Sequence, residues 1–282
     1  MDVCRPALRW HGGKWLLAPW IISHFPRHKI YVEPFGGAMS VLLRKHRSYA
    51  EIYNDLDQSV VNLFRVLRSD RAHDLHSQIL ATPFSRVEFL ESYVDCSDEV
   101  ESARRLVIRS FMGFGSNSHE RVSGFRANSN RSGSTPAHDW KNYGECMGAL
   151  IARVRGVVIE NKDAKAVMLQ HDGPASLHYV DPPYVLSTRS DFKKDYAVEL
   201  SDADHLELLS FLKTLAGSVI LSGYKNEIYE QNLLGWKRFE RESFADGARK
   251  RTEVLWLNQA AVSRSAGFGD FALIPNPTDR SA

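Results

Sequence analysis

The segment DPPY, from Asp181 to Tyr184, directly follows the short apolar run SLHYV. Proline has no N–H for a β-ladder and fixes its own φ, so the predicted strand must end in a turn here. Asp181 then presents a carboxylate at the strand end, and the Pro182 carbonyl is available as a second acceptor. Pro183 stiffens the turn, and Tyr184 offers a flat ring for stacking. Two acceptors and one aromatic face suit an exocyclic amine on a planar heterocycle; the alternative is a structural turn with a packed tyrosine.

A second candidate site follows another short strand, in the segment VEPFGGA. Glu33 lies at the end of this strand, and Gly36 and Gly37 form the turn after it. Glycine lets backbone N–H groups approach a ligand closely, and the N-terminus of the next helix adds a positive field. Asp55 ends the following strand about 20 residues later, where an acid takes the ribose hydroxyls of an adenosine-type cofactor. Asp57 is instead a candidate cap for the next helix.

The glycine pattern argues against the common nucleotide-binding loops. GxGxxG, which cradles a pyrophosphate, occurs nowhere in the chain. HGGKW resembles the end of a P-loop, but GxxxxGK[ST] is absent and Trp15 stands where the hydroxyl residue belongs. An adenosine cofactor without a pyrophosphate indicates S-adenosylmethionine, and the alternative is that the glycine pair is only a tight structural turn.

The DPPY segment suits methyl transfer from this cofactor to an adenine amine. The amine is a weak nucleophile because its lone pair is delocalised into the ring. Two acceptors at its hydrogens localise that lone pair for in-line attack on the sulfonium methyl, and positioning and electrostatics supply most of the rate. The proton released afterwards goes either to Asp181 or to water.

Short strands alternate with helices in two portions of the chain, which predicts a doubly wound, mainly parallel α/β sheet. A helix over about residues 201–217 has Ser201 as its N-cap, Leu206, Leu209 and Leu212 on one face, and Gly217 as its C-terminal cap. Another helix is expected over about residues 38–46. Strands are expected at residues 30–33, up to Asn54–Asp55, and within GVVIENKD, SLHYVD and GSVILSGY. The segments WKRFERESF and RKRTEVLWLN predict a closing antiparallel pair around a turn at residues 246–247.

The segment from about residue 65 to 156 interrupts the α/β pattern. It is mostly helical by pattern, with Pro83 as a break and SDEVESARRLVIRSFMGF as the clearest helix. Residues 115–140 are rich in Ser, Asn, Gly and Arg and contain Phe125 among arginines. These residues indicate a nucleic-acid contact loop, and a flexible linker is the alternative.

The composition, 43% hydrophobic and 25% charged over 282 residues, is that of a soluble globular protein. The net charge is only +2, so a basic surface must come from local clustering. The three cysteines lack metal-ligand spacing, so we expect neither a metal nor a disulfide framework. No apolar run reaches the ~18 residues of a membrane span. We therefore expect a cytoplasmic protein that has no membrane association.

The motifs quoted above resemble those of the Dam-type family of DNA adenine-N6 methyltransferases, in the same order and over nearly the whole chain. RWHGGKW is similar to the family's N-terminal cofactor motif, VEPFGGAMSV to the motif after the first strand, and DPPY is the catalytic motif as it stands. Met39 departs from the family's usual glycine. The resemblance implies that Lys14 meets the cofactor's carboxylate and that Asp163, in NKDA, meets its adenine amine. The cofactor-binding residues expected in all are Trp10, Gly12, Gly13, Lys14, Glu33, Phe35, Gly36, Gly37, Asp55, Asp163 and Asp181.

The resemblance also implies a division into a catalytic domain, residues 1–64 and 157–282, and an inserted target-recognition domain, residues 65–156. Arginine suits guanine edges and asparagine suits adenine edges in the major groove. The DNA-binding residues expected are Arg121, Arg126, Asn128, Asn130 and Arg189. Arg189 belongs to VLSTRSDFKKDY, a candidate mobile loop over the pocket whose alternative is a solvated basic loop.

The resulting hypothesis is a site-specific enzyme that methylates N6 of adenine in double-stranded DNA and extrudes the base to do so. Asp181, Pro182, Pro183 and Tyr184 are its expected catalytic residues. S-adenosylmethionine is its expected cofactor, with no metal and no obligatory protein partner, in the cytoplasm of a bacterial or phage-infected cell. The alternatives are a methyltransferase for RNA adenine or for a protein glutamine, and a catalytically inactive DNA-binding regulator.

Overall fold

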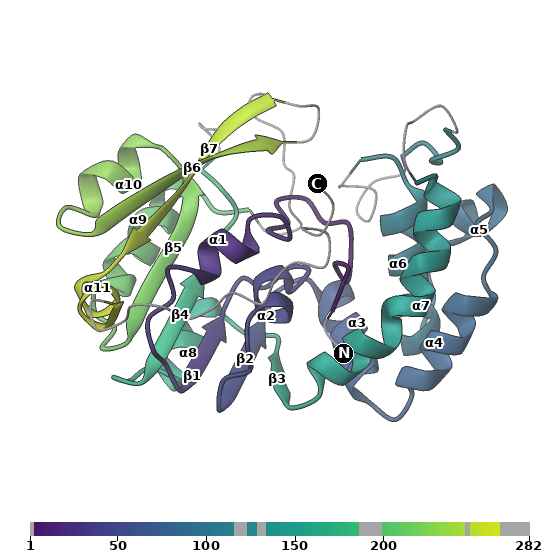
Figure 1. Ribbon diagram of the computed structural model, residues 1–282, viewed down its shortest axis with the longest axis horizontal. Coiled ribbons are helices and arrows are strands. Elements are labelled where there is room, and N and C mark those ends of the chain that lie inside the picture. The colour runs from purple at the N-terminus through teal and green to yellow at the C-terminus, as the bar shows by residue number, and fades with distance from the viewer. Residues whose placement is uncertain (1–2, 116–122, 129–133, 186–198, 246–248, 266–282) are drawn as a thin grey trace, which may run out of the picture.

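The structure is a computed structural model that describes residues 3–115, 123–128, 134–185, 199–245 and 249–265. These residues form a seven-stranded sheet in the order β3-β2-β1-β4-β5-β7-β6 (Figure 1). The strands are β1 (Ile30–Glu33), β2 (Ala50–Asn54), β3 (Val157–Glu160), β4 (Ser176–Val180), β5 (Ser218–Tyr224), β6 (Lys237–Ala245) and β7 (Arg249–Leu257). Strands β1 to β5 are parallel, whereas β7 runs antiparallel to both β5 and β6. The expected fold class, a mainly parallel Rossmann-like sheet with a closing antiparallel hairpin, is confirmed.

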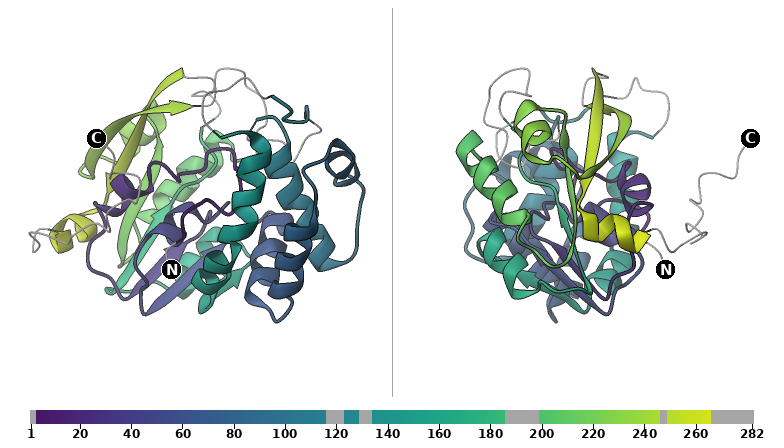
Figure 2. Two further views of the ribbon diagram at one scale, coloured as in Figure 1. Left: turned by 45° about the vertical axis from the view of Figure 1, so that its right-hand side comes forward. Right: turned by 90° about the vertical axis from the view of Figure 1, so that its left-hand side faces the viewer.

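Helices cover both faces of the sheet. They are α1 (Ala18–Ile22), α2 (Ser40–Arg44), α3 (Gln58–Arg68), α4 (Ala72–Ala81), α5 (Arg86–Glu91), α6 (Glu99–Met112), α7 (Pro136–Val154), α8 (Ala164–Gln170), α9 (Asp202–Leu212), α10 (Glu227–Asn232) and α11 (Gln259–Ser265). Buried residues of α8, α9 and α10 pack with Val32 and Val180, and those of α1, α2, α3 and α11 pack with Tyr31 and Tyr179. Alternate residues of one strand therefore face opposite helix layers, as the pleat requires. Figure 2 shows the two layers on either side of the sheet.

The helices α4 to α7 lie beside the β3 end of the sheet, inserted between α3 and β3 (Figure 1). Helix α6 begins after Asp98, whose side chain accepts the Glu101 N–H at 2.8 Å, and it is the helix that SDEVESARRLVIRSFMGF predicts. Pro83 lies between α4 and α5, as expected for a break. Helix α3 packs against α6, α7 and β3 within one continuous hydrophobic cluster. The predicted boundary at residues 64–65 thus falls inside α3, and the division into two domains stays a prediction.

Helix α9 corrects two expectations. Its N-cap, Ser201, is confirmed and forms a reciprocal capping box with Asp204. Leu206, however, is 43% exposed. The buried stripe of α9 runs through His205, Leu208, Leu209 and Leu212, so its first turn buries His205 instead of Leu206. The helix ends at Leu212 rather than near Gly217, which instead leads into β5 and donates its N–H to Asp172 at 2.8 Å. Among the helices described, none is long and apolar enough to cross a membrane.

Candidate active site

The site lies where the strand order of the sheet reverses. Strands β1 and β4 are neighbours, but the chain proceeds from β1 towards β2 and from β4 towards β5, in opposite directions across the sheet. Ligands of open α/β sheets bind beyond the carboxyl ends of the strands at such a point. Glu33 ends β1, Asp181 follows β4, and Asp55 follows β2. Three acids that are distant in sequence therefore meet at one edge.

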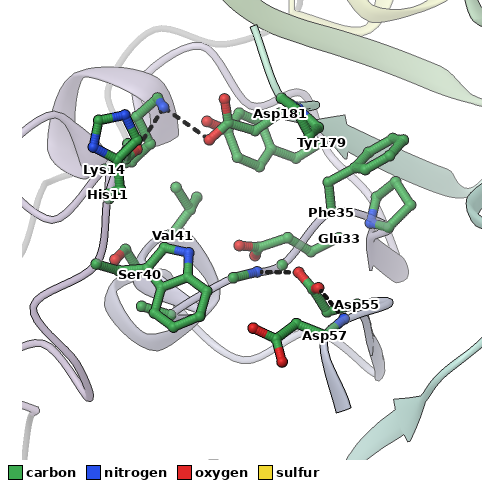
Figure 3. A pocket seen from close by; sticks show the side chains of 18 of the residues that line it. His11, Lys14, Glu33, Phe35, Ser40, Val41, Asp55, Asp57, Tyr179 and Asp181 are labelled. Carbon is green, nitrogen blue, oxygen red and sulfur yellow. Dashed lines mark hydrogen bonds and ion pairs between the residues drawn. The ribbon is translucent and has the colours of Figure 1, made fainter. Parts of the chain in front are cut away.

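A pocket of about 920 Å³ of empty volume, with open solvent at its mouth included, occupies this edge (Figure 3). Lys14 and Asp181 lie at one end of it, Asp55 and Asp57 lie at the other, and Glu33 lies between. Its lining includes ten of the eleven predicted cofactor-binding residues, namely Trp10, Gly12, Gly13, Lys14, Glu33, Phe35, Gly36, Gly37, Asp55 and Asp181. The structure thus brings together residues from four separate segments of the chain.

Asp163 is the predicted cofactor residue that does not line the pocket. Its side chain is exposed and accepts the Ala166 N–H at 3.0 Å, which caps α8. The pocket wall at this point is formed by its neighbour Ala164. A contact between Asp163 and the cofactor's adenine stays a prediction.

The glycine turn is held close to its neighbours. The Gly37 N–H donates to Asp55 Oδ2 at 2.7 Å, and the Tyr53 hydroxyl donates to the Gly37 carbonyl at 2.7 Å. A Cβ at Gly36 would lie 2.1 Å from the Tyr53 ring, and one at Gly37 would lie 2.8 Å from Trp10 Nε1. Only glycine fits these two positions, since no real Cβ atom comes that close.

The two acids after β2 have different environments. Asp57 accepts the Ser59 N–H at 2.8 Å and caps α3, which confirms the role considered for it. Asp55 lines the pocket and also accepts the Asp57 N–H at 2.9 Å. Burial raises the pKa of Asp55, and its backbone hydrogen bonds counteract the rise.

Met39, which replaces the family's usual glycine, has a backbone conformation that favours glycine. It precedes α2 in the left-handed conformation, with φ 58° and ψ 27°, and among the described non-glycine residues it alone has a positive φ. Glycine adopts this conformation without a steric cost, whereas an L-residue does not. The Met39 side chain is fully buried in the core, so its packing offsets the strained backbone.

Glu33 is a buried acid in the middle of the pocket. Its Oε2 accepts the Tyr31 hydroxyl at 2.8 Å and the Leu42 N–H at 3.0 Å. Burial raises the pKa of Glu33 to about 8; the Tyr31 hydrogen bond opposes the rise, and the negative charge of Asp181 adds to it. A positive ligand charge near Glu33 would therefore favour its ionised form.

Asp181 and Lys14 form an ion pair at the other end of the pocket. Lys14 Nζ lies 2.9 Å from Asp181 Oδ2 and donates to the Gly12 carbonyl at 2.7 Å. The same ammonium lies 4.8 Å from the centre of the Tyr184 ring. Asp181 Oδ1 is buried and has no hydrogen-bond partner within the described ranges. Burial raises the pKa of Asp181, and Lys14 counteracts the rise.

The rest of the DPPY turn lies around this ion pair. Pro183 lines the pocket, Pro182 is buried, and Tyr184 is only 7% exposed. The Tyr184 hydroxyl donates to Glu253 of β7.

Sequence reasoning missed two of the side chains around this site, Glu253 and Tyr179. Tyr179 lines the pocket, and strand alternation was a usable signal for it because it lies two residues before Asp181. For Glu253, the signal is a single acid within the apolar strand TEVLWL.

Two of the five predicted DNA-binding residues, Arg126 and Asn128, belong to the described part of the chain. Arg121, Asn130 and Arg189 fall outside the described residues. Asn128 is exposed, whereas Arg126 donates to the Phe111 carbonyl at 2.9 Å and lies 3.6 Å from Asp139. Residues 112–114 and 124–126 pair in antiparallel fashion through a bridge between Gly113 and Phe125. Base reading by these side chains stays a prediction.

Two arginines of α6, Arg104 and Arg105, are held by acids. Arg104 pairs with Glu88 at 2.9 Å, and both Arg104 and Arg105 pair with Glu101 at 2.6 Å. Arg109 donates to the Ser92 carbonyl. These contacts tie α6 to its neighbours.

No three His, Cys, Asp or Glu side chains in the described part of the chain come together as they would around a metal ion. A comparison with curated proteins gave no match. The family model described as D12 class N6 adenine-specific DNA methyltransferase matches residues 10–245, which include β1 to β6, the glycine turn and the DPPY turn. With this match over most of its length, the chain belongs to the D12 class of N6 adenine-specific DNA methyltransferases.

Proposed function

We propose that the protein transfers a methyl group from S-adenosylmethionine to N6 of adenine at a short specific site in double-stranded DNA. The observation that carries the proposal is the Asp181 carboxylate. It lies in the pocket directly after β4, and its buried Oδ1 has no hydrogen-bond partner within the described residues. A buried acceptor without a partner costs free energy, and that cost is recovered when a donor binds there.

The residues of the pocket fit a cationic adenosine-type cofactor. Glu33, Asp55 and Asp181 line it, and the basic side chain Lys14 lines it with them, so acids are in excess. Side chains are absent from the glycine turn, so a ligand can approach its backbone closely. Asp55 lies just after β2, where ribose hydroxyls are held in related folds. Trp10, Gly12, Gly13, Lys14, Phe35, Gly36, Gly37 and Asp163 complete the proposed binding set. When bound, the cofactor supplies an electrophilic methyl group.

The chain's own residues prepare the amine for attack. Asp181 and the Pro182 carbonyl accept the two amine hydrogens and so localise the nitrogen lone pair. Pro183 keeps the turn rigid, which lets the two acceptors act without reorganising. The ammonium of Lys14, which donates to Asp181 and lies over the Tyr184 ring, supports this assignment because it is an N–H donor in the place proposed for the amine.

Duplex DNA is the proposed substrate because the matched family acts on adenine in DNA, and because the inserted residues 65–156 are the proposed target-recognition domain. An adenine paired in a duplex must leave the stack to reach Asp181, which costs a few kcal/mol. Residues 65–156 are the proposed target-recognition domain, with Arg121, Arg126, Asn128 and Asn130 as base-reading candidates and Arg189 as a contact near the pocket.

The deciding experiment supplies labelled cofactor with duplex DNA, RNA and protein as separate acceptors. We expect label in DNA adenine alone, and duplex oligonucleotides should be better acceptors than single strands. Label in RNA or in a glutamine side chain would replace the proposal with one of its alternatives. Tight DNA binding without any transfer would indicate a regulator instead. The matched control is Asp181→Asn, which keeps the shape of the side chain but replaces an acceptor oxygen with an NH₂ donor.

A further inference from the structure

Glu253 is a buried acid outside the cofactor pocket. It lies on β7, is 2% exposed, and pairs across the ladder with Tyr224 of β5. The Glu253 side chain lies on the same face of the sheet as Ser222, and its strand β7 is separated from β4 by β5 alone. Unlike Glu33, Asp55 and Asp181, Glu253 does not line the pocket, so ligand binding in the pocket does not explain why this acid is buried.

Two hydroxyl groups donate to the same oxygen of Glu253. The Tyr184 hydroxyl donates to Oε1, and Ser222 Oγ donates to that oxygen at 2.7 Å. An oxygen that accepts two hydrogen bonds uses both of its lone pairs and carries no proton itself. Glu253 therefore joins the DPPY turn to strand β5 through one oxygen atom.

The Tyr184 ring is held by other contacts besides this hydrogen bond. The ring meets Tyr224 edge to face, with centroids 4.4 Å apart and planes at 72°, and the Lys14 ammonium lies 4.8 Å from its centre. Edge-to-face packing against one neighbour supports the ring from one side. A hydroxyl bonded to a buried carboxylate anchors the far end of the ring as well. Burying a carboxylate is costly, and simple packing of a ring against β5 needs no carboxylate.

We propose that Glu253 is a positioning residue for methyl transfer, which acts through the Tyr184 hydroxyl to hold the ring on which the target adenine stacks. This inference rests on the proposed function. The inference requires that Glu253 acts on methyl transfer only through the Tyr184 hydroxyl. Replacing Glu253 should therefore have no further effect on the transfer rate when that hydroxyl is absent.

The test compares Tyr184→Phe, Glu253→Ala, their double variant and Glu253→Gln. Glu253→Gln retains an amide oxygen that accepts the hydroxyl, and Ser222→Ala removes the other donor to Oε1 while leaving Tyr184 unchanged. Three measurements are made on each protein: single-turnover methylation of duplex DNA, the Kd for S-adenosylhomocysteine by calorimetry, and the fluorescence of 2-aminopurine placed at the target adenine. Circular dichroism and thermal melting confirm folding.

We expect Tyr184→Phe and Glu253→Ala to lower the transfer rate each by about tenfold, as for loss of one charge-assisted hydrogen bond. The double variant should be no slower than Tyr184→Phe, and Glu253→Gln should recover most of the rate. The Kd should stay within about twofold of the wild-type value, because Glu253 does not line the pocket. The 2-aminopurine signal should lose the quenching caused by stacking on Tyr184 in the two slow single variants, whereas Ser222→Ala should resemble the wild type.

A full further loss on adding Glu253→Ala to Tyr184→Phe would overturn the inference, as would unchanged 2-aminopurine quenching. If Glu253→Ala fails to fold, Tyr184→Phe against Ser222→Ala still decides, because the inference requires a loss only in the first. If the wild-type protein transfers no methyl group, the proposed function is wrong as well. If the wild-type protein methylates DNA and Tyr184→Phe does so at the same rate, only the role of Glu253 is refuted.

Discussion

Lys14 Nζ lies 2.9 Å from Asp181 Oδ2, so the N-terminal segment HGGKW and the DPPY turn are joined by an ion pair at the proposed site of chemistry. The resemblance to the Dam-type family implied that Lys14 meets the cofactor's carboxylate. In the structure its partner is the acid proposed to accept the target amine. The first prediction concerns this pair.

Burial raises the pKa of Asp181, and replacing Lys14 with methionine removes the positive charge that counteracts this rise. An acid that loses a cationic partner becomes harder to ionise, so its pKa rises. If transfer needs the ionised carboxylate, the acid limb of the pH–rate profile moves to higher pH in Lys14→Met. Single-turnover rates between pH 5 and 9 measure the shift. Lys14→Arg should keep the wild-type limb, and Lys213→Met, at an exposed lysine, should leave it unmoved. A limb that stays in place in Lys14→Met contradicts the prediction.

Gly36→Ala should reduce both stability and cofactor affinity, because its Cβ would lie 2.1 Å from the Tyr53 ring, which must then move. The expected loss of stability is about 1–3 kcal/mol, as for an overpacked core. Gly148→Ala is the matched control, since nothing lies within 4 Å of its Cβ on α7. There alanine should stabilise by up to ~1 kcal/mol. Thermal melting and calorimetry with S-adenosylhomocysteine compare the two, and equal behaviour would mean that the glycine turn is looser than the structure indicates.

At Met39, glycine should be tolerated better than alanine. Both substitutions remove the buried side chain, but only glycine relieves the left-handed backbone, so Met39→Gly should be the more stable by about 1 kcal/mol. The opposite order is expected at Leu42, a buried residue within α2, where glycine costs about 1 kcal/mol more than alanine. Chemical denaturation of the four variants measures the order. The same order at both positions would refute the role assigned to the φ of Met39.

Binding of S-adenosylmethionine should release protons near neutral pH. With the pKa of Glu33 at about 8, this acid is largely protonated at pH 7, and a nearby sulfonium charge favours its ionised form. The pKa of Glu33 falls on binding, so affinity rises as pH increases towards about 8. Calorimetry in buffers of different ionisation enthalpy counts the protons. S-adenosylhomocysteine has the same amino group but no sulfonium and should release fewer, and Glu33→Gln should remove the difference. Equal proton release by the two ligands in the wild-type protein would count against the prediction.

Asp139→Asn should strengthen binding to DNA if Arg126 contacts the duplex. The Arg126 guanidinium lies 3.6 Å from Asp139, and weakening this pair leaves its charge more available to DNA. The expected gain in affinity is about threefold, typical of a partly exposed ion pair. Arg126→Ala should lower affinity and reduce the preference for the target site, as fluorescence anisotropy with matched duplexes would report. Glu145→Gln breaks an exposed pair on the same helix and serves as the control. If Asp139→Asn leaves affinity for DNA at the wild-type value, Arg126 only anchors its own segment.

The strands, the glycine turn and the DPPY turn could be predicted because each depends on residues that are close in sequence. Proline ends β4 wherever that strand lies in space, and Asp98 and Ser201 cap their helices through contacts within one turn. The mainly parallel sheet could be predicted from the alternation of strands and helices, since parallel neighbours need crossover connections. In such a sheet the carboxyl ends of the parallel strands share one edge, which places Glu33 and Asp181 near each other.

The partners of the chemical groups were decided only by tertiary structure. Lys14 pairs with Asp181, and the Tyr184 hydroxyl donates to Glu253. Only folding brings these distant segments together. Burial likewise depends on the packed environment, which is why Leu206 is exposed and why the pKa of Glu33 rises to about 8. A sequence specifies which groups a chain carries and how each short segment turns. The distances between those groups, and hence their charges and hydrogen bonds, arise when distant segments exclude water from one another.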